Sequence, residues 1–236
     1  MKNTLLIACI GIISTGLFAA ESNPKEKLAE ASRQLGEKPN YSWSATTKEA
    51  DGSPGRLGPI DGKTEKDNLT FLSLTPGGIP VEVYMKGDKG VARALEGWQT
   101  FDEIAQTSGT AAAIVRFLKS YKTPAAQSAE LARNMSELKE ADGILSGELK
   151  EDAIKEILLM GGRRREGQET PKTTDAKGTV KFWIKNGALN KYEINVQGKV
   201  ATADRSVDIN RTTTVEIKEI GSTKIEAPAE AKEKIS

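Results

Sequence analysis

The sequence has 236 residues, of which 37% are hydrophobic and 28% are charged, and its formal net charge is +1. This length and composition suit one globular domain. The chain has no histidine and only one cysteine, which excludes a Ser/His/Asp triad and metal sites built on several His or Cys ligands. A nearly neutral chain also lacks the overall field that gathers nucleic acid.

Residues 1–20 have the composition of a cleavable secretory signal. Lys2 provides a basic start, residues 4–18 are mostly apolar, and Ala19 and Ala20 form the small-residue end at which we expect cleavage. The apolar run is interrupted by polar residues and is shorter than the about 20 residues of a membrane span. A retained N-terminal anchor is therefore the less favoured alternative, and we expect a periplasmic protein.

Cys9 follows Leu6-Ile7-Ala8, which superficially resembles a bacterial lipobox. Only eight residues precede it, too few for both a basic start and a full apolar segment, so lipid anchoring at Cys9 is not expected. The mature chain, residues 21–236, would then carry no thiol, with 33 basic and 33 acidic residues.

The first part of the mature chain predicts one helix and then short strands. Asn23 is a good N-cap for a helix that begins at Pro24, and Gly36 is a plausible end. From Asn40 the apolar residues alternate with polar ones, as in a half-buried strand. Closely spaced turns indicate an antiparallel meander, whose further strands are expected near 58–66, 69–74, 80–86 and 89–95.

Helical signals dominate the middle of the chain. Thr100 and Glu103 have capping-box spacing, and apolar residues after Gly109 predict a second helix. A third helix is expected from Pro124, with an apolar stripe formed by Leu131, Met135 and Leu138. A strand over 143–149, a helix over 150–160 and a polar loop over 163–175 follow.

The C-terminal part predicts sheet again. Val180, Phe182 and Ile184 alternate with Lys181, Trp183 and Lys185, and Asn186-Gly187 is a strong hairpin signal. We expect a further turn at 197–199, a strand over 207–218 and a short helix over 229–235. Strands with helices inserted as a block indicate one α+β domain over 21–236, with helices covering one face of the sheet.

No catalytic or metal-binding motif is present. The acidic pairs Asp102-Glu103 and Glu151-Asp152 lie at expected helix starts, where capping and the helix dipole explain them. The basic cluster at 163–165 could contact phosphate or an anionic lipid headgroup, but a solvated helix C-terminus is the favoured explanation. We therefore expect no enzyme, no catalytic residue, no metal and no cofactor.

Three segments carry a resemblance to a known family. They are Tyr41-Ser42-Trp43, the stretch 176–184 with the turn at 186–187, and the closing pattern over 212–228. With these segments in place, the chain resembles the LolA-like superfamily of periplasmic proteins, which includes lipoprotein carriers and the LppX/LprG lipoproteins.

The resemblance implies a strongly curved antiparallel sheet, an incomplete β-barrel, with helices closing its open side over a hydrophobic cavity. It also implies an apolar partner, either a lipid acyl chain or a lipidated protein, with transient membrane contact. Aromatic residues concentrate in the strands, where they either fill the core or line such a cavity. The alternative is a protein-interaction or sensor module with a filled cavity. The candidate ligand-binding residues are Trp43, Phe71, Tyr84, Phe182 and Ile184.

Overall fold

The computed structural model describes residues 23–93, 97–107, 109–159, 171–202 and 205–235. The expected signal at residues 1–20, Cys9 within it, and the arginine cluster at 163–165 lie outside these residues. Among the described residues, no helix has both the length and the apolar character to cross a membrane.

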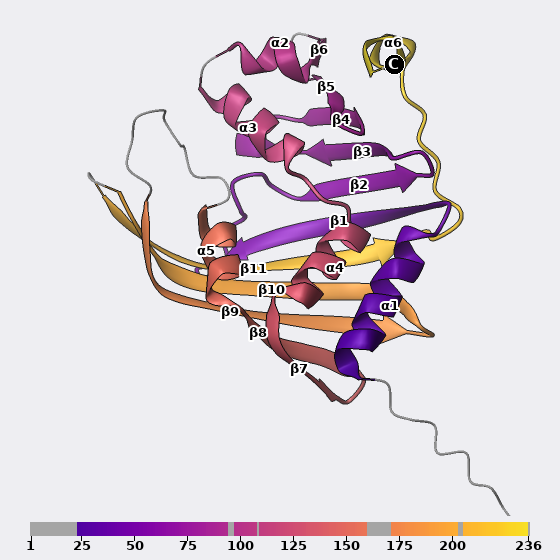
Figure 1. Cartoon of the computed structure of the whole chain (residues 1–236). Helices are drawn as coiled ribbons and strands as arrows, with labels where there is room; N and C mark the ends of the chain where they lie inside the picture. Colours follow the sequence, from indigo (N-terminus) through magenta and orange to yellow (C-terminus); the bar gives the residue numbers. More distant parts are fainter. Residues whose placement is uncertain (1–22, 94–96, 108, 160–170, 203–204, 236) are drawn as a thin grey trace, which may run out of the picture.

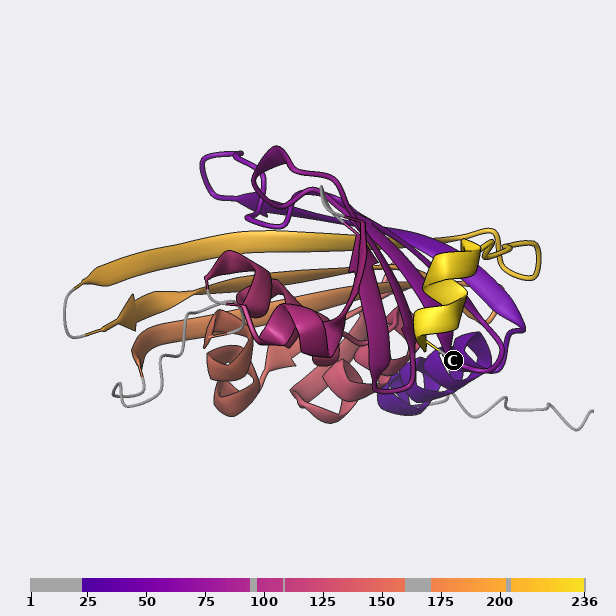
Figure 2. The ribbon, with the colours of Figure 1, turned by 90° about the horizontal axis from the view of Figure 1, so that it is seen from above.

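Every named strand belongs to one antiparallel sheet of 11 strands, in the order β6-β5-β4-β3-β2-β1-β11-β10-β9-β8-β7. The predicted α+β class with a curved, unclosed antiparallel sheet is confirmed (Figures 1 and 2). The strands are β1 (Asn40–Glu49), β2 (Ile60–Glu65), β3 (Leu69–Leu74), β4 (Val81–Lys86), β5 (Lys89–Arg93), β6 (Trp98–Thr100), β7 (Met135–Ala141), β8 (Ile144–Leu149), β9 (Lys172–Lys185), β10 (Ala188–Ala201) and β11 (Ser206–Lys218).

The strand order explains where the helices lie. β6 and β7 form the opposite edges of the sheet, so the chain between them has to cross one whole face. Figure 1 shows α2, α3 and α4 making this crossing, with α1 and α5 beside them. The helices are α1 (Pro24–Gly36), α2 (Phe101–Ala105), α3 (Thr110–Lys119), α4 (Pro124–Arg133), α5 (Glu151–Leu159) and α6 (Ala229–Ile235), with a 3-10 turn at Pro76–Gly78.

We call the helix-covered side of the sheet the inner face, and glycines on it let large side chains approach closely. A Cβ built on Gly62 would lie 2.1 Å from the Trp43 indole, and one on Gly90 would lie 2.2 Å from the Phe101 ring. Trp43 pairs with Gly62 on β2 and with Ile217 on β11. These two glycines thus make room for Trp43 on β1 and for Phe101 at the start of α2.

The opposite side, the outer face, carries a smaller aromatic cluster. Tyr84 and Trp98 have ring centroids 5.3 Å apart, and Phe71 lies 4.9 Å from Tyr84. The C-terminal helix α6 covers this cluster with Ala231 and Ile235, both of them buried. Helices therefore cover both sides of the sheet near β4 to β6.

Most expected elements are present at nearly the predicted bounds. The capping box at Thr100 and Glu103 forms as expected, and Asn186 and Gly187 both have the positive φ of a two-residue hairpin turn. The helix expected from Pro124 is α4, and it ends at Arg133. Placing Met135 and Leu138 on this helix was wrong, because both belong to β7.

Two further predictions were wrong. The expected turn at 197–199 is absent, since β10 continues to Ala201 through a register shift between Gln197 and Lys199. A Cβ on Gly198 would lie 2.7 Å from Leu158 of α5, so this glycine permits close helix packing. The expected polar loop over 163–175 is strand from Lys172 onward.

Candidate functional site

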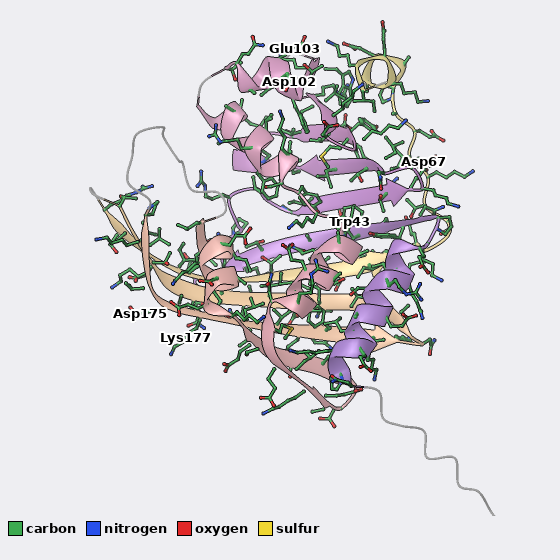
Figure 3. All side chains as sticks on the ribbon, viewed as in Figure 1. Trp43, Asp67, Asp102, Glu103, Asp175 and Lys177 are labelled. Atoms are coloured by element: carbon green, nitrogen blue, oxygen red, sulfur yellow. The ribbon has the colours of Figure 1, made fainter. Side chains whose placement is uncertain are left out.

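A cavity of about 540 Å³ lies between the inner face of the sheet and the helices. Its boundary includes the β2–β3 turn at Asp67 and Asn68, the β4–β5 turn at Gly87 and Asp88, and the end of α1 at Gly36. Figure 3 places Asp67 at the tip of its hairpin and Trp43 farther into the sheet on β1. The cavity therefore opens at one end of the sheet and runs inward beneath the helices.

Below the charged rim, the wall of the cavity consists of uncharged side chains that are buried or half-buried. β1, β2, β3 and β4 contribute side chains from the inner face, and α2, α3 and α4 contribute the opposite side. Its buried members are Tyr41, Thr70, Met85, Phe101, Leu118 and Ala125. An apolar wall with a few placed polar groups is the usual composition of a small-molecule site.

The rim carries charges of both signs. Its charged members are Glu37, Lys38, Glu65, Lys66, Asp67, Asp88 and Lys119. Three of these are engaged within the protein, because Glu37 pairs with Arg33, Lys119 pairs with Asp102 at 3.0 Å, and Glu65 accepts the Ile225 N–H at 2.6 Å. All of them except Glu65 are exposed, so the cavity passes from a charged rim to an uncharged interior.

Three aromatic side chains meet at the inner end of the cavity. Tyr121 lies in the connection between α3 and α4 and packs parallel to Trp43, with ring centroids 6.5 Å apart. The Trp43 indole Nε1–H donates a hydrogen bond to the Tyr121 hydroxyl at 3.0 Å. Tyr41 lies 5.7 Å from Trp43, and its hydroxyl accepts the Ala125 backbone N–H at 3.4 Å. These contacts fix the inner wall of the cavity.

Burial sets the chemistry of the two tyrosines in this wall. Burial raises the pKa of Tyr41, and the Thr123 side chain and the Ala125 N–H oppose this rise. Burial likewise raises the pKa of Tyr121, against the opposing hydrogen bond from Trp43. Both phenols are therefore neutral at ordinary pH and act as hydrogen-bonding groups rather than as charges.

The five candidate residues are not brought together. Trp43 stands directly behind the Tyr41 and Tyr121 side chains that line the cavity. Phe182 is fully buried and Ile184 packs against the same inner core, in contact with other side chains. Phe71 and Tyr84 lie on the outer face in the cluster beneath α6. Contact between any of the five and a ligand stays a prediction.

Sequence reasoning missed the residues that form most of this wall. In the sequence, Met85 and Leu118 are ordinary apolar members of a predicted strand and a predicted helix, and Phe101 is distinguished only by its place in the capping box. Tyr121 carried one usable signal, because it is an aromatic residue in a short connection just before Pro124. Only the strand order, which sends this connection across the inner face, shows that it reaches the cavity.

A second hollow of about 780 Å³ lies between α1 and α4. Small residues such as Ala29, Ala126 and Ala129 line it, with Arg33 and Arg133 at its margin. None of the deep aromatic residues of the inner core lines it. Among the described residues, no group of three or more acidic or thiol side chains is placed to hold a metal ion.

No family model matches the chain, and no curated protein matches its sequence. Solved structures do match. The chain is similar in fold to LppX. This lipoprotein of Mycobacterium tuberculosis is 10% identical, with 86% of this chain and 97% of LppX covered at a TM-score of 0.48.

Two other matches are of the same kind. LprF from Mycobacterium bovis is 10% identical, with 88% of this chain and 97% of that chain covered at a TM-score of 0.47. A LolA superfamily protein from Nitrosomonas europaea is 9% identical, with 86% and 95% covered at a TM-score of 0.35.

Proposed function

We propose that this protein binds a hydrophobic ligand, a lipid acyl chain or the lipid part of a lipidated protein, in the cavity on its inner face. The observation that carries the proposal is an apolar, buried wall behind a charged rim. The cavity volume of about 540 Å³ falls within the range of about 300–1,000 Å³ for small-molecule sites. A ligand with an apolar chain and a polar end matches this gradient.

The binding energy would come from removing apolar surface from water. Each buried methylene contributes about 0.8 kcal/mol, so a chain that contacts Met85, Phe101 and Leu118 would gain several kcal/mol before ordering costs. The carboxylates of the lining stand on the rim, and the buried part of the wall offers hydroxyls as its only polar side-chain groups, so binding rather than catalysis is proposed.

Export belongs to the same proposal. Cleavage after Ala19 or Ala20 would place the mature chain in the periplasm, where transient contact with a membrane could deliver the ligand. The mass of the intact protein purified from its own host tests this directly. A mass that retains residues 1–20 would contradict the cleavage.

One observation favours a second candidate, a protein-interaction or sensor module. The inner face beyond Trp43 is filled by the protein's own side chains, because Phe182, Leu189 and Tyr192 are each 0% exposed. If the cavity were also filled or collapsed in solution, the partner would bind an external surface instead.

Two variants distinguish these candidates. Thr64 lines the cavity from β2, so Thr64→Phe should narrow it and weaken binding of an environment-sensitive apolar dye at least tenfold. Ser73→Phe adds the same ring on the outer face of the adjacent strand β3 and is the matched control. Equal binding by the wild type and both variants would reject the cavity as the site.

Native mass spectrometry of the protein from its own host provides the second test. Co-purifying lipid that is retained by Ser73→Phe and lost from Thr64→Phe is the expected result. Repeated absence of any adduct from the wild type, together with no dye binding, would favour the interaction module.

A further inference from the structure

The hydroxyl of Tyr121 has an unusual hydrogen-bonding arrangement at the cavity wall. A phenol has one proton to donate and two lone pairs to accept, whereas an indole N–H can only donate. The bond between Trp43 and Tyr121 therefore uses an acceptor position of Tyr121 and leaves its proton unused. Among the described residues, the bond from Trp43 is the one hydrogen bond of the Tyr121 hydroxyl, and it leaves the phenol proton without a protein acceptor.

Other hydroxyls of the wall are engaged with the protein. Thr64 donates to the Leu69 carbonyl at 3.3 Å, and Thr70 lies 3.3 Å from the Thr64 oxygen, to which it can donate. The Tyr41 oxygen also acts as an acceptor, from the Ala125 N–H, and interacts with the Thr123 side chain. Tyr41 is only 2% exposed, however, whereas Tyr121 is half-buried and more accessible from the cavity. Tyr121 is thus the wall group best placed to donate to a bound molecule.

The position of Tyr121 is also well fixed. Its ring stacks on Trp43 and meets Phe117 edge-on, with centroids 5.7 Å apart. A donor that is held by packing and by a hydrogen bond it accepts, here from Trp43, loses little conformational freedom when a ligand binds. The Trp43 N–H further restricts the directions in which the Tyr121 proton can point.

The charge distribution limits what this donor can recognise. Charged side chains stand on the rim, and the buried wall has none. A carboxylate at the depth of Tyr121 would lose its hydration without a cation to compensate, which is costly. An uncharged acceptor, such as the carbonyl of an ester or amide, is satisfied by a single hydroxyl.

We infer that Tyr121, held in place by Trp43, selects ligands that carry an uncharged carbonyl next to their apolar chain. This inference rests on the proposed function, because it concerns the same cavity. Tyr121 would be the specificity-determining residue and Trp43 a positioning residue.

The test compares two probes that differ in one group. A monoacylglycerol carries an ester carbonyl, and the 1-O-alkyl glycerol of equal chain length does not. We expect the wild type to bind the ester about fivefold more tightly, the effect of one ordinary hydrogen bond. Tyr121→Phe should remove this preference by weakening ester binding alone.

Two results would overturn the inference in different ways. If the wild type binds both probes equally well, or if Tyr121→Phe weakens both equally, the inference fails while the proposed function stands. If the wild type binds neither probe, nor the apolar dye, both fail together.

A spectroscopic measurement covers the case in which Tyr121→Phe does not fold. The infrared carbonyl stretch of a ¹³C-labelled ester bound to the wild type should move to lower frequency than in an apolar solvent. Trp43→Phe, which lacks the N–H, should reduce this shift. An unshifted carbonyl in the wild type would overturn the inference.

Discussion

Replacing Gly62 by alanine should destabilise the protein through the indole of Trp43. The new Cβ would lie 2.1 Å from two indole carbons and 2.7 Å from Nε1. The indole cannot yield freely, because it is 2% exposed and donates to the Tyr121 hydroxyl. Overpacking costs about 1–3 kcal/mol, and losing the hydrogen bond adds about 1 kcal/mol.

A smaller effect opposes this cost. Alanine reduces the conformational freedom of the unfolded chain, which stabilises by about 0.4–1 kcal/mol. The expected net loss in the free energy of unfolding is therefore about 1–4 kcal/mol. Equilibrium unfolding in urea, followed by tryptophan fluorescence, measures it.

Gly36→Ala is the matched control, because its Cβ would meet only the Ala125 Cβ at an ordinary 3.6 Å. In a double-mutant cycle, Trp43→Phe should reduce the cost of Gly62→Ala by supplying space. If Gly62→Ala is as stable as the wild type and its indole emission is unchanged, the close approach of β2 to Trp43 is refuted.

Three more predictions concern other parts of the molecule. Burial raises the pKa values of Tyr41, Tyr84, Tyr121 and Tyr192 above 10, so their contribution to the free energy of unfolding is fully present below pH 10 and is lost as the pH rises above it. Tyrosinate absorbance at pH 10 should be far weaker in the native than in the urea-unfolded protein, and equal absorbance would contradict this. Thr100→Ala removes the capping box of α2 and should cost about 1 kcal/mol, whereas Thr100→Ser should cost less; equal losses in urea unfolding would count against the cap. Ala231→Asp places a charge in the buried contact of α6 and should release this helix rather than unfold the sheet, so limited proteolysis should cut near residues 219–235 while the unfolding midpoint changes little. An uncut chain would contradict that expectation.

Local signals were sufficient for much of the fold. Asn186-Gly187 specifies its hairpin because both residues accept positive φ, and the capping box marks α2 for an equally local reason. Met135 was placed on the helix because its spacing of four residues from Leu131 fits a continuing helix. The same spacing is equally compatible with a helix that ends at Arg133. Nothing in residues 134–138 alone distinguishes a continuing helix from a strand that pairs with β8.

The site was harder to predict because it depends on strand order. Tyr41 and Trp43 alternate with serines on one strand, which indicates that they share one face of the sheet. Phe71 and Tyr84 look equivalent to them in sequence, yet they face α6 on the outer side. Which face of a meander meets the crossing helices is decided by contacts between distant segments, such as β1 with β11.

The unclosed sheet has a mechanical consequence. In the described part of the chain, no hydrogen-bonded ladder joins β6 to β7. A closed barrel has a circumference set by its strand number and stagger, but this sheet can flatten or curl with its backbone pairing intact. The segment from α2 to α4 connects the two edge strands, β6 and β7, across the inner face. The width of the space beneath it can therefore change by bending of the sheet, without the loss of backbone hydrogen bonds.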